Sequence, residues 1–195
     1  MLINPSCTRY QRKQKTLFSA EYPDKRKMRT LKIEDRKEID EVIRSCKTCF
    51  VSFCEGDIPY VVPMNFALDQ DCIILHMAQA GRKWETLRRN HNVCITWISG
   101  EKIAWQDVNV GCSYRVKSKS VIIEGQAEIV DDFREKTECM EKLMAQYTTI
   151  AFKFSVPSIR NVGVVKVRIK EISARKFGAK AITPWNRQDS TDEDD

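Results

Sequence analysis

Most of the chain either alternates apolar and polar residues or contains short unbroken apolar runs, and both patterns are typical of β-strands. Clusters of polar turn-forming residues, such as Asp69-Gln70-Asp71, separate these runs. The strands predicted from this pattern are residues 49–54, 60–66, 72–77, 92–98, 114–130 and 162–172.

Three other segments carry apolar residues at the spacing of an amphipathic helix. They are residues 33–46, residues 132–147 and a shorter segment that contains Trp84 and Leu87. Helices and strands do not alternate strictly along the chain. The sequence therefore predicts an α+β or mostly β fold of the barrel type, and not a doubly wound α/β fold.

Several residues interrupt the predicted strands. Pro63 has no backbone N–H, so it indicates either a local break in the sheet or a strand with one open side, where a ligand can approach the backbone. Gly125 indicates a bulge or a close backbone approach. Residues 99–111 show no clear pattern, and Trp105 within them is open to two interpretations, a core residue or a lid over a pocket.

Length and composition describe a single soluble domain. The chain has 195 residues, of which 42% are hydrophobic, and this is enough for a sizeable core. No apolar run approaches the roughly 20 residues that span a bilayer. The first residues lack the uninterrupted apolar region of a secretory signal, so we expect a cytoplasmic protein that does not enter the membrane.

The two ends of the chain differ in charge from the rest. Residues 1–30 are polar and basic and are predicted to form a flexible arm, or one that wraps a partner subunit. Residues 31–178 form the predicted domain, and residues 179–195 end in an acidic tail that we expect to be disordered. The net charge of +6 comes largely from the arm, and the domain has no basic stripe, which argues against a nucleic-acid partner.

Eight cysteines are present, and Cys46 and Cys49 form a C-x-x-C motif. A zinc site would need a second ligand pair, and no matching C-x-x-C or H-x-x-x-H follows. A thioredoxin-like motif would have a strand before it and a helix after it, whereas the predicted order here is reversed. We therefore predict structural thiols and no metal site.

The candidate chemistry lies in one short stretch. Gly81, Arg82 and Lys83 stand at the start of a predicted helix, where free N–H groups and two cations suit a phosphate; the alternative is a plain helix start with exposed cations. His76 precedes them in an apolar strand, as either a packed residue or a functional one, whereas His91 is interpreted as structural or surface. The sequence contains no nucleophile triad, P-loop or G-x-G-x-x-G motif.

Three blocks, PYVVPMNF at 59–66, ILHMAQAGRKWETL at 74–87 and KSVIIEGQAEIV at 119–130, together resemble the pyridoxamine 5′-phosphate oxidase superfamily of flavin-binding proteins. The pattern VP-x-NF followed by H-x-A-x-x-G-[RK]-K resembles the nitroimidazole-resistance subgroup in particular. The similarity runs from about residue 28 to residue 176, which is most of the chain.

The resemblance implies an antiparallel, Greek-key split β-barrel with peripheral helices. It also implies FMN as cofactor, with FAD possible, and a homodimer that holds the flavin between its subunits. His76 would be the catalytic residue, beside the flavin ring, and the cations at 82 and 83 would hold the flavin phosphate. The residues implied to contact the flavin are Val61, Val62, Pro63, Met64, Asn65, His76, Met77, Gly81, Arg82, Lys83 and Ser120.

The sequence departs from the oxidase pattern in two places. Asn65 stands where the oxidase has a lysine, and the oxidase's C-terminal Arg-x-His type of ending is not replaced by residues 174–177. The resemblance therefore favours an FMN-dependent oxidoreductase that reduces a different small-molecule acceptor, in the manner of a nitroimidazole reductase. The alternative is a flavin- or haem-binding module, or a structural homodimer, without turnover.

Overall fold

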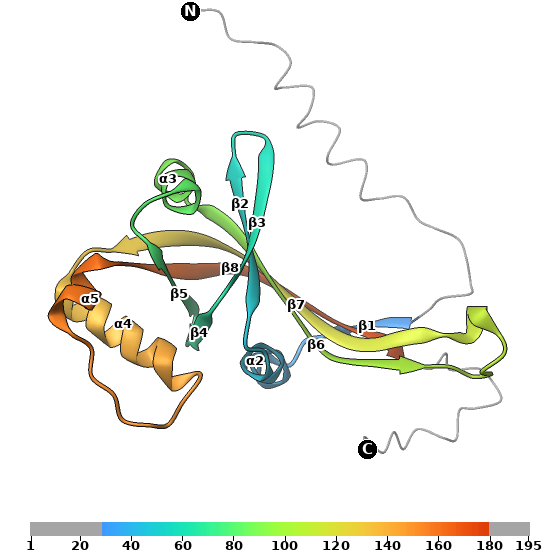
Figure 1. Ribbon diagram of the computed structural model, residues 1–195. Helices are drawn as coiled ribbons and strands as arrows, with labels where there is room; N and C mark the ends of the chain where they lie inside the picture. Colours follow the sequence, from blue (N-terminus) through green and yellow to red (C-terminus); the bar gives the residue numbers. More distant parts are fainter. Residues whose placement is uncertain (1–28, 180–195) are drawn as a thin grey trace, which may run out of the picture.

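The computed structural model describes residues 29–179 (Figure 1). One mostly antiparallel sheet, four helices and one short 3-10 helix make up this part of the chain. In chain order they are β1 (Arg29–Ile33), α2 (Arg36–Ser45), β2 (Cys49–Glu55), β3 (Ile58–Met64), β4 (Phe66–Asp69), β5 (Cys72–Ala78), α3 (Arg82–Arg89), β6 (Asn92–Ala104), η1 (Gly111–Ser113), β7 (Arg115–Val130), α4 (Phe133–Ala145), α5 (Val156–Asn161) and β8 (Val162–Ala179).

The sheet is curled but not closed. Its strand order is β3-β2-β6-β7-β8-β5-β4, with β1 added beside β8. The two end strands, β3 and β4, follow each other directly in the chain and are separated only by Asn65. Because one residue joins the two ends of the sheet, the sheet must curl until these ends meet. The result is the split barrel that the sequence predicts.

The single strand predicted at 60–66 is two strands in the structure. Residues up to Met64 pair with β2, and residues from Phe66 pair with β5. Pro63 lies in the first of these, opposite Phe50, on a strand that pairs along one side only. Both interpretations of Pro63 are therefore correct, since a break follows it and its strand has an open side.

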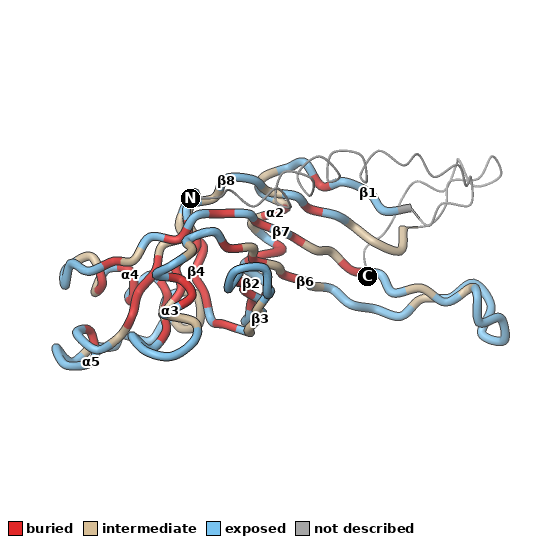
Figure 2. The backbone as a smooth tube through the Cα atoms, turned by 90° about the horizontal axis from the view of Figure 1, so that it is seen from above, coloured by how far each residue is buried: buried red, intermediate tan, exposed pale blue. Residues whose placement is uncertain are grey.

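Alternate residues of the strands fill the barrel. Trp97 is fully buried there and packs edge-on against Phe66, with ring centroids 5.3 Å apart. The same interior face carries further fully buried residues from β2, β6 and β7, among them Val51, Ile95, Val121 and Ile123. Figure 2 shows that the buried residues gather in this body of the molecule.

A second core lies outside the barrel, under α4 and α5. Ile74 of β5 and Val164 of β8 are directed to this outer side, where Leu143 and Ile159 of the two helices cover them. Three consecutive residues of β5, from Ile73 to Leu75, are buried for this reason. A strand covered on both faces has a continuous apolar run instead of an alternating pattern.

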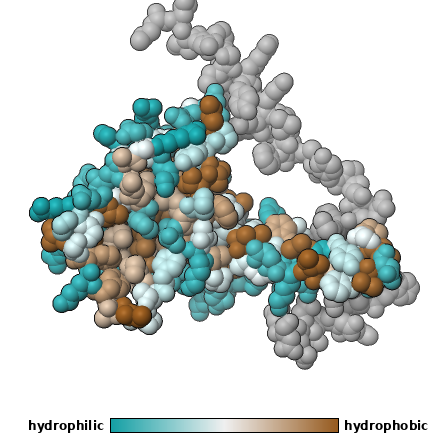
Figure 3. All heavy atoms as spheres, in the orientation of Figure 1, coloured by the Kyte–Doolittle hydropathy of each residue, from teal (hydrophilic) through white to brown (hydrophobic). Residues whose placement is uncertain are grey.

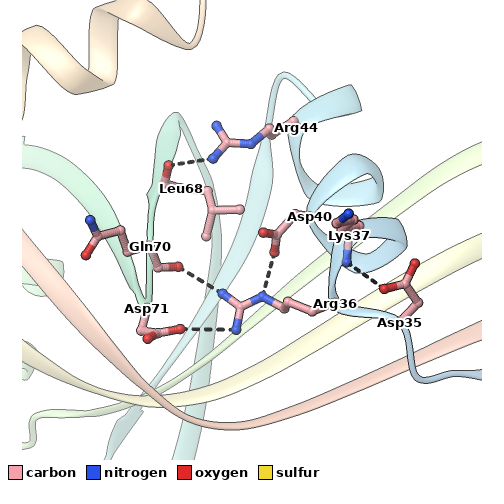
Figure 4. Close-up of polar contacts among 8 residues, drawn as sticks. All are labelled: Asp35, Arg36, Lys37, Asp40, Arg44, Leu68, Gln70 and Asp71. Carbon is pink, nitrogen blue, oxygen red and sulfur yellow. Dashed lines mark hydrogen bonds and ion pairs between the residues drawn. The ribbon is translucent and has the colours of Figure 1, made fainter.

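Helix α2 is fastened across the hairpin of β4 and β5 (Figure 4). Arg36 donates to the Asp40 carboxylate at 2.7 Å, to the Asp71 carboxylate at 3.1 Å and to the Gln70 carbonyl at 2.9 Å. The helix begins at Arg36 and not at Ile33 as predicted. Ile33 ends β1, and the Asp35 carboxylate accepts from the Lys37 N–H as the helix cap.

Strands β6 and β7, with β1 and the end of β8, extend beyond the body as a long arm of β-sheet (Figures 1 and 2). This arm is a different segment from the basic arm predicted at residues 1–30. Part of the stretch without a clear sequence pattern belongs to this arm, since β6 continues to Ala104. Trp105 is not a core residue. It is half exposed at the tip of the arm, where its ring stacks on that of Tyr114 with the ring centroids 5.5 Å apart.

Gly125 lies at a bulge, as the sequence indicates. The register between β7 and β8 shifts between Glu124 and Gly125. A Cβ atom at Gly125 would lie 2.5 Å from the Val167 side chain and 2.7 Å from the Arg168 carbonyl oxygen, so only glycine fits without rearrangement.

The described part of the chain begins and ends with a strand. Strand β1 starts at Arg29, two residues inside the predicted arm, and β8 ends at Ala179. Residues 1–28 and 180–195, which carry most of the predicted arm and tail, lie outside the described part of the chain. Among the helices between residues 29 and 179, none is long and apolar enough to cross a membrane.

Candidate functional site

A cleft of about 480 Å³ opens beside the corner where β3 passes into β4. Strand β5, the first turn of α3 and the junction of α5 with β8 form its other walls. The residues that line it are Pro63, Met64, Asn65, His76, Met77, Ala78, Lys83, Ser158, Asn161 and Val162.

The corner at Asn65 is held by side chains from two directions. The Asn65 carboxamide donates to the Lys47 carbonyl at 3.3 Å. The hydroxyl of Tyr147, which lies two residues after α4, accepts from the Phe66 N–H at 2.9 Å and lies 3.1 Å from the carbonyl oxygens of Lys47 and Phe66. The wall that β3 and Asn65 give to the cleft is therefore tied to α4 and to the end of α2.

His76 enters the cleft from the outer side of the sheet. It pairs with Val164 of β8, and its Nδ1 atom is buried without a hydrogen-bond partner among the described residues. Burial, and secondarily the positive charge of Lys83, lowers the pKa of His76 below its usual value of 6.5. The imidazole is therefore mainly neutral at pH 7, and a ligand in the cleft can pair with its buried nitrogen.

Lys83 and the start of α3 supply a site for an anion. Gly81 precedes the helix with φ +85°, a conformation that strongly favours glycine, although a Cβ there would meet nothing within 4 Å. The first N–H groups of the helix have no partner within it. Lys83 lines the cleft and forms no ion pair in the part of the chain that the structure describes.

Arg82, the neighbouring cation, is directed elsewhere. Its Nε donates to the Glu55 carboxylate at 3.0 Å, and its guanidinium carbon lies 4.2 Å from the centre of the Tyr60 ring. Arg82 therefore fastens α3 to the hairpin of β2 and β3, and it does not line the cleft. Arg82 and Lys83, which the sequence predicts to hold a phosphate together, have different contacts in the structure.

Six of the predicted flavin contacts line the cleft. Of the others, Gly81 stands at the start of α3 and Val62 packs against the barrel interior. Val61 and Ser120 lie on the outer face of the sheet, where Val61 is opposite Ser52 and Ser120 is opposite Ile98. Strand parity places these two on the same side as Pro63, beside the cleft but not in it. The six residues in the cleft are Pro63, Met64, Asn65, His76, Met77 and Lys83.

The wall formed by α5 is not predicted from the sequence. Ser158 and Asn161 of this helix, with Val162 after it, line the cleft on the side of His76. A signal was present, because Ser155 is a good helix cap and Pro157 suits a first helical turn. A helix of six residues is too short to show a clear apolar period.

The two cysteines of the C-x-x-C motif are buried structural residues. Cys46 and Cys49 are buried, and their thiols donate to the Ile98 and Met64 carbonyl oxygens at 3.2 and 3.4 Å. Burial raises the pKa of Cys49 to about 12, so its thiol stays protonated and unreactive at neutral pH.

The residues of the cleft fit a flavin. Lys83 and the start of α3 suit its phosphate, and the open edge of β3 offers backbone groups to a flat ring. The buried Nδ1 of His76 has no hydrogen-bond partner among residues 29–179, and a flavin ring or its substrate can provide one. The cleft is lined by one cation and no carboxylate, in keeping with an anionic ligand.

Comparison with known proteins defines the family. The family described as pyridoxamine 5′-phosphate oxidase matches residues 35–176. A candidate 5-nitroimidazole antibiotic resistance protein from Bacteroides thetaiotaomicron has a solved structure that is 38% identical, with a TM-score of 0.71, over 78% of this chain and 90% of that one. The chain therefore belongs to the pyridoxamine 5′-phosphate oxidase family, and it resembles the nitroimidazole-resistance branch as the sequence predicts.

More distant structures share the fold. The flavocytochrome Anf3 from Azotobacter vinelandii is 18% identical, with a TM-score of 0.68, over 78% of this chain and 72% of that one. An FAD- and haem-binding protein from Mycobacterium smegmatis is 11% identical, with a TM-score of 0.69, over 78% and 76% of the two chains. Curated protein sequences gave no match.

Proposed function

We propose that this protein is a flavin-dependent oxidoreductase that binds FMN in the cleft and reduces a small nitroaromatic acceptor. The observation that carries the proposal is that one cleft holds the buried Nδ1 of His76 and the ammonium group of Lys83, of which the first has no hydrogen-bond partner and the second no ion pair among residues 29–179. A cation suits the cofactor phosphate, and a neutral histidine suits a reacting centre. The 38% identical relative, named for 5-nitroimidazole resistance, suggests the class of acceptor.

The chemistry balances with a single proton from the protein. Reduction of a nitro to a nitroso group takes two electrons and two protons and releases one water. Reduced flavin, when bound, supplies a hydride, which carries both electrons and one proton. His76 supplies the second proton to an acceptor oxygen within hydrogen-bond reach. Lys83 and the start of α3 hold the cofactor, and Asn65 and its neighbours shape the wall beside the ring.

A single-turnover experiment tests this function. FMN-loaded protein is photoreduced without oxygen, with EDTA as electron donor, and mixed with a 5-nitroimidazole. We expect the flavin to reoxidise with loss of one equivalent of the nitro absorbance, faster than free reduced FMN does. A protein that binds FMN but reacts no faster than free FMN would be a binding module without turnover. A protein that binds haem and not FMN would also contradict the proposal.

The dimer expected from the sequence has a suitable surface. Phe50, Val61, Ile98 and Ile122 lie on the outer face of the sheet with exposed fractions of 46%, 57%, 45% and 39%. The same face continues onto the arm as an apolar groove of about 700 Å³ (Figure 3 shows hydrophobic residues at the arm surface). Exposed apolar surface of this extent is typical of a protein interface.

We infer that two copies pair through this outer face and form a two-fold dimer, which is the commonest kind of oligomer. Val61 and Ser120 lie on it, next to Pro63 of the cleft, so dimerisation would bring the second copy to the edge of the flavin site. This arrangement would explain why the two residues are separated from the cleft in a single chain.

Ile98→Asp should therefore convert a dimer to a monomer and weaken FMN binding. The buried charge would have no partner in the interface. Ile150→Asp is the matched control, because Ile150 is 75% exposed on the connection between α4 and α5, away from this face. Light scattering after gel filtration measures the oligomeric state of both variants, and titration of flavin fluorescence measures their FMN affinity. A parent protein that is monomeric with FMN present, or an Ile98→Asp variant that stays dimeric, would contradict the inferred interface.

A further inference from the structure

We infer that Asn161 binds the acceptor, by donating a hydrogen bond to its oxygen opposite His76, and that Gln79 holds Asn161 in position. The inference rests on the proposed function and adds to it the residue that selects the substrate. Asn161 was not among the residues expected from the sequence, and it enters the site through α5.

The register of the sheet brings the end of α5 close to His76. His76 pairs with Val164 and Ala78 pairs with Val162, so on the outer side of β8 Val164 lies opposite His76 and Val162 lies diagonal to it. Asn161 directly precedes Val162 and lines the same cleft. An acceptor that takes a proton from His76 in this cleft can therefore also reach the end of α5.

Asn161 has an unused hydrogen-bonding side chain. Its carboxamide is exposed and forms no hydrogen bond within residues 29–179. The other polar residue of the wall is already engaged: the Ser158 hydroxyl lies 2.6 Å from the Ser155 hydroxyl and donates to the Ser155 carbonyl at 3.0 Å. Asn161 is thus the free donor on this wall.

The backbone on both sides of Asn161 is fixed. The Gln79 carboxamide donates to the Arg160 carbonyl at 2.9 Å and to the Val162 carbonyl at 2.8 Å. The Lys136 amine donates to the Val162 carbonyl at 3.0 Å, and the side chain of Ile159 is buried in the second core. A binding residue held this way loses little entropy when the ligand arrives.

The chemistry of the wall favours an acceptor that carries oxygen. A carboxamide N–H donates to a nitro or quinone oxygen of the bound acceptor. The start of α3 and Lys83 suit the cofactor phosphate instead. Asn161 should therefore act on the acceptor, with little effect on FMN.

The test measures kcat and KM for a 5-nitroimidazole, with the Kd for FMN, in the FMN-loaded full chain. Asn161→Ala should raise KM about 3- to 10-fold and leave kcat and the FMN Kd within about twofold, as expected for one neutral hydrogen bond. Asn161→Asp should raise KM further, because a carboxylate only accepts. Gln79→Ala should raise KM in the same direction by a smaller factor, because Asn161 is then less well positioned.

Gln146→Ala is the matched control for Gln79, because the Gln146 carboxamide also donates to a backbone carbonyl, that of Arg44 at 3.1 Å, outside the cleft. It should change none of the constants. Two results for Asn161→Ala would overturn the inference: an unchanged KM, or a loss of FMN affinity as large as the rise in KM. The proposed function would still stand in either case, provided that the parent protein reduces the 5-nitroimidazole. A parent without turnover would overturn both.

Discussion

His76→Ala should lower the turnover of a nitroaromatic acceptor by about 10²-fold or more, because a positioned proton donor typically contributes that much. FMN binding should persist, since Lys83 and the start of α3 hold the phosphate end. His76→Asn should show the same loss, because its carboxamide can fill the site of the buried Nδ1 but cannot titrate. Stopped-flow measurement of flavin reoxidation gives the rates.

His91→Asn is the control for this experiment. His91 is the only other histidine of the chain, and its Nδ1 lies 3.1 Å from the Ala127 carbonyl oxygen, outside the cleft. Its replacement should leave turnover unchanged. If His76→Ala instead loses thermal stability and stays fully active per folded molecule, His76 is a core residue and its proposed role is wrong.

The lowered pKa of His76 also gives the direction of the pH dependence. Its charged form is scarce at pH 7, so the rate of acceptor reduction should rise as the pH falls below 6.5, and the His76→Asn rate should not. In the flavin-free protein, the unfolded chain takes up a proton below pH 6.5 before the folded chain does. Stability should therefore fall as the pH is lowered through this range, less so in His76→Asn.

Lys83→Ala should weaken FMN binding by about 10- to 100-fold, the effect of losing one charge-assisted hydrogen bond of about 1.5–3 kcal/mol. Arg82→Ala should have a much smaller effect, because its guanidinium already contacts Glu55 and Tyr60. Titration of flavin fluorescence measures both. Riboflavin, which lacks the phosphate, should bind equally well to the parent and to Lys83→Ala.

Two results would contradict this assignment of the phosphate. One is an Arg82→Ala variant that loses as much FMN affinity as Lys83→Ala, because Arg82 would then have to leave Glu55 when FMN binds. The other is an equal loss of FMN and riboflavin affinity in Lys83→Ala, which would place Lys83 beside the ring and not beside the phosphate.

The sequence predicts the strands well because period-two alternation reports directly which side of a sheet is buried. It fails at 60–66, where an unbroken apolar run conceals a change of partner strand at Asn65. It also fails at the arm, where β6 continues without a body to pack against. In both cases the structure depends on pairing between distant strands, which the local pattern of apolar and polar residues does not predict.

The candidate site is predicted only in part for similar reasons. Adjacent helical residues point about 100° apart, so the spacing of Arg82 and Lys83 cannot tell which one faces the cleft. Ser120 and Val61 belong to the outer face because of strand parity over several pairings. Helix α5 depends on the packing of Ile159 in the second core. This long-range contact cannot be predicted from the six residues of the helix.

The central claim is that the cleft beside His76 and Lys83 binds a flavin. Because the chain has only two histidines, NMR of protein carrying ¹⁵N-labelled histidine resolves one imidazole in the cleft and one outside it. His91→Asn assigns the two signals. Titration with FMN should shift the His76 nitrogens in a saturable manner and leave those of His91 unchanged. Saturating FMN that leaves the His76 signals in place would contradict the account.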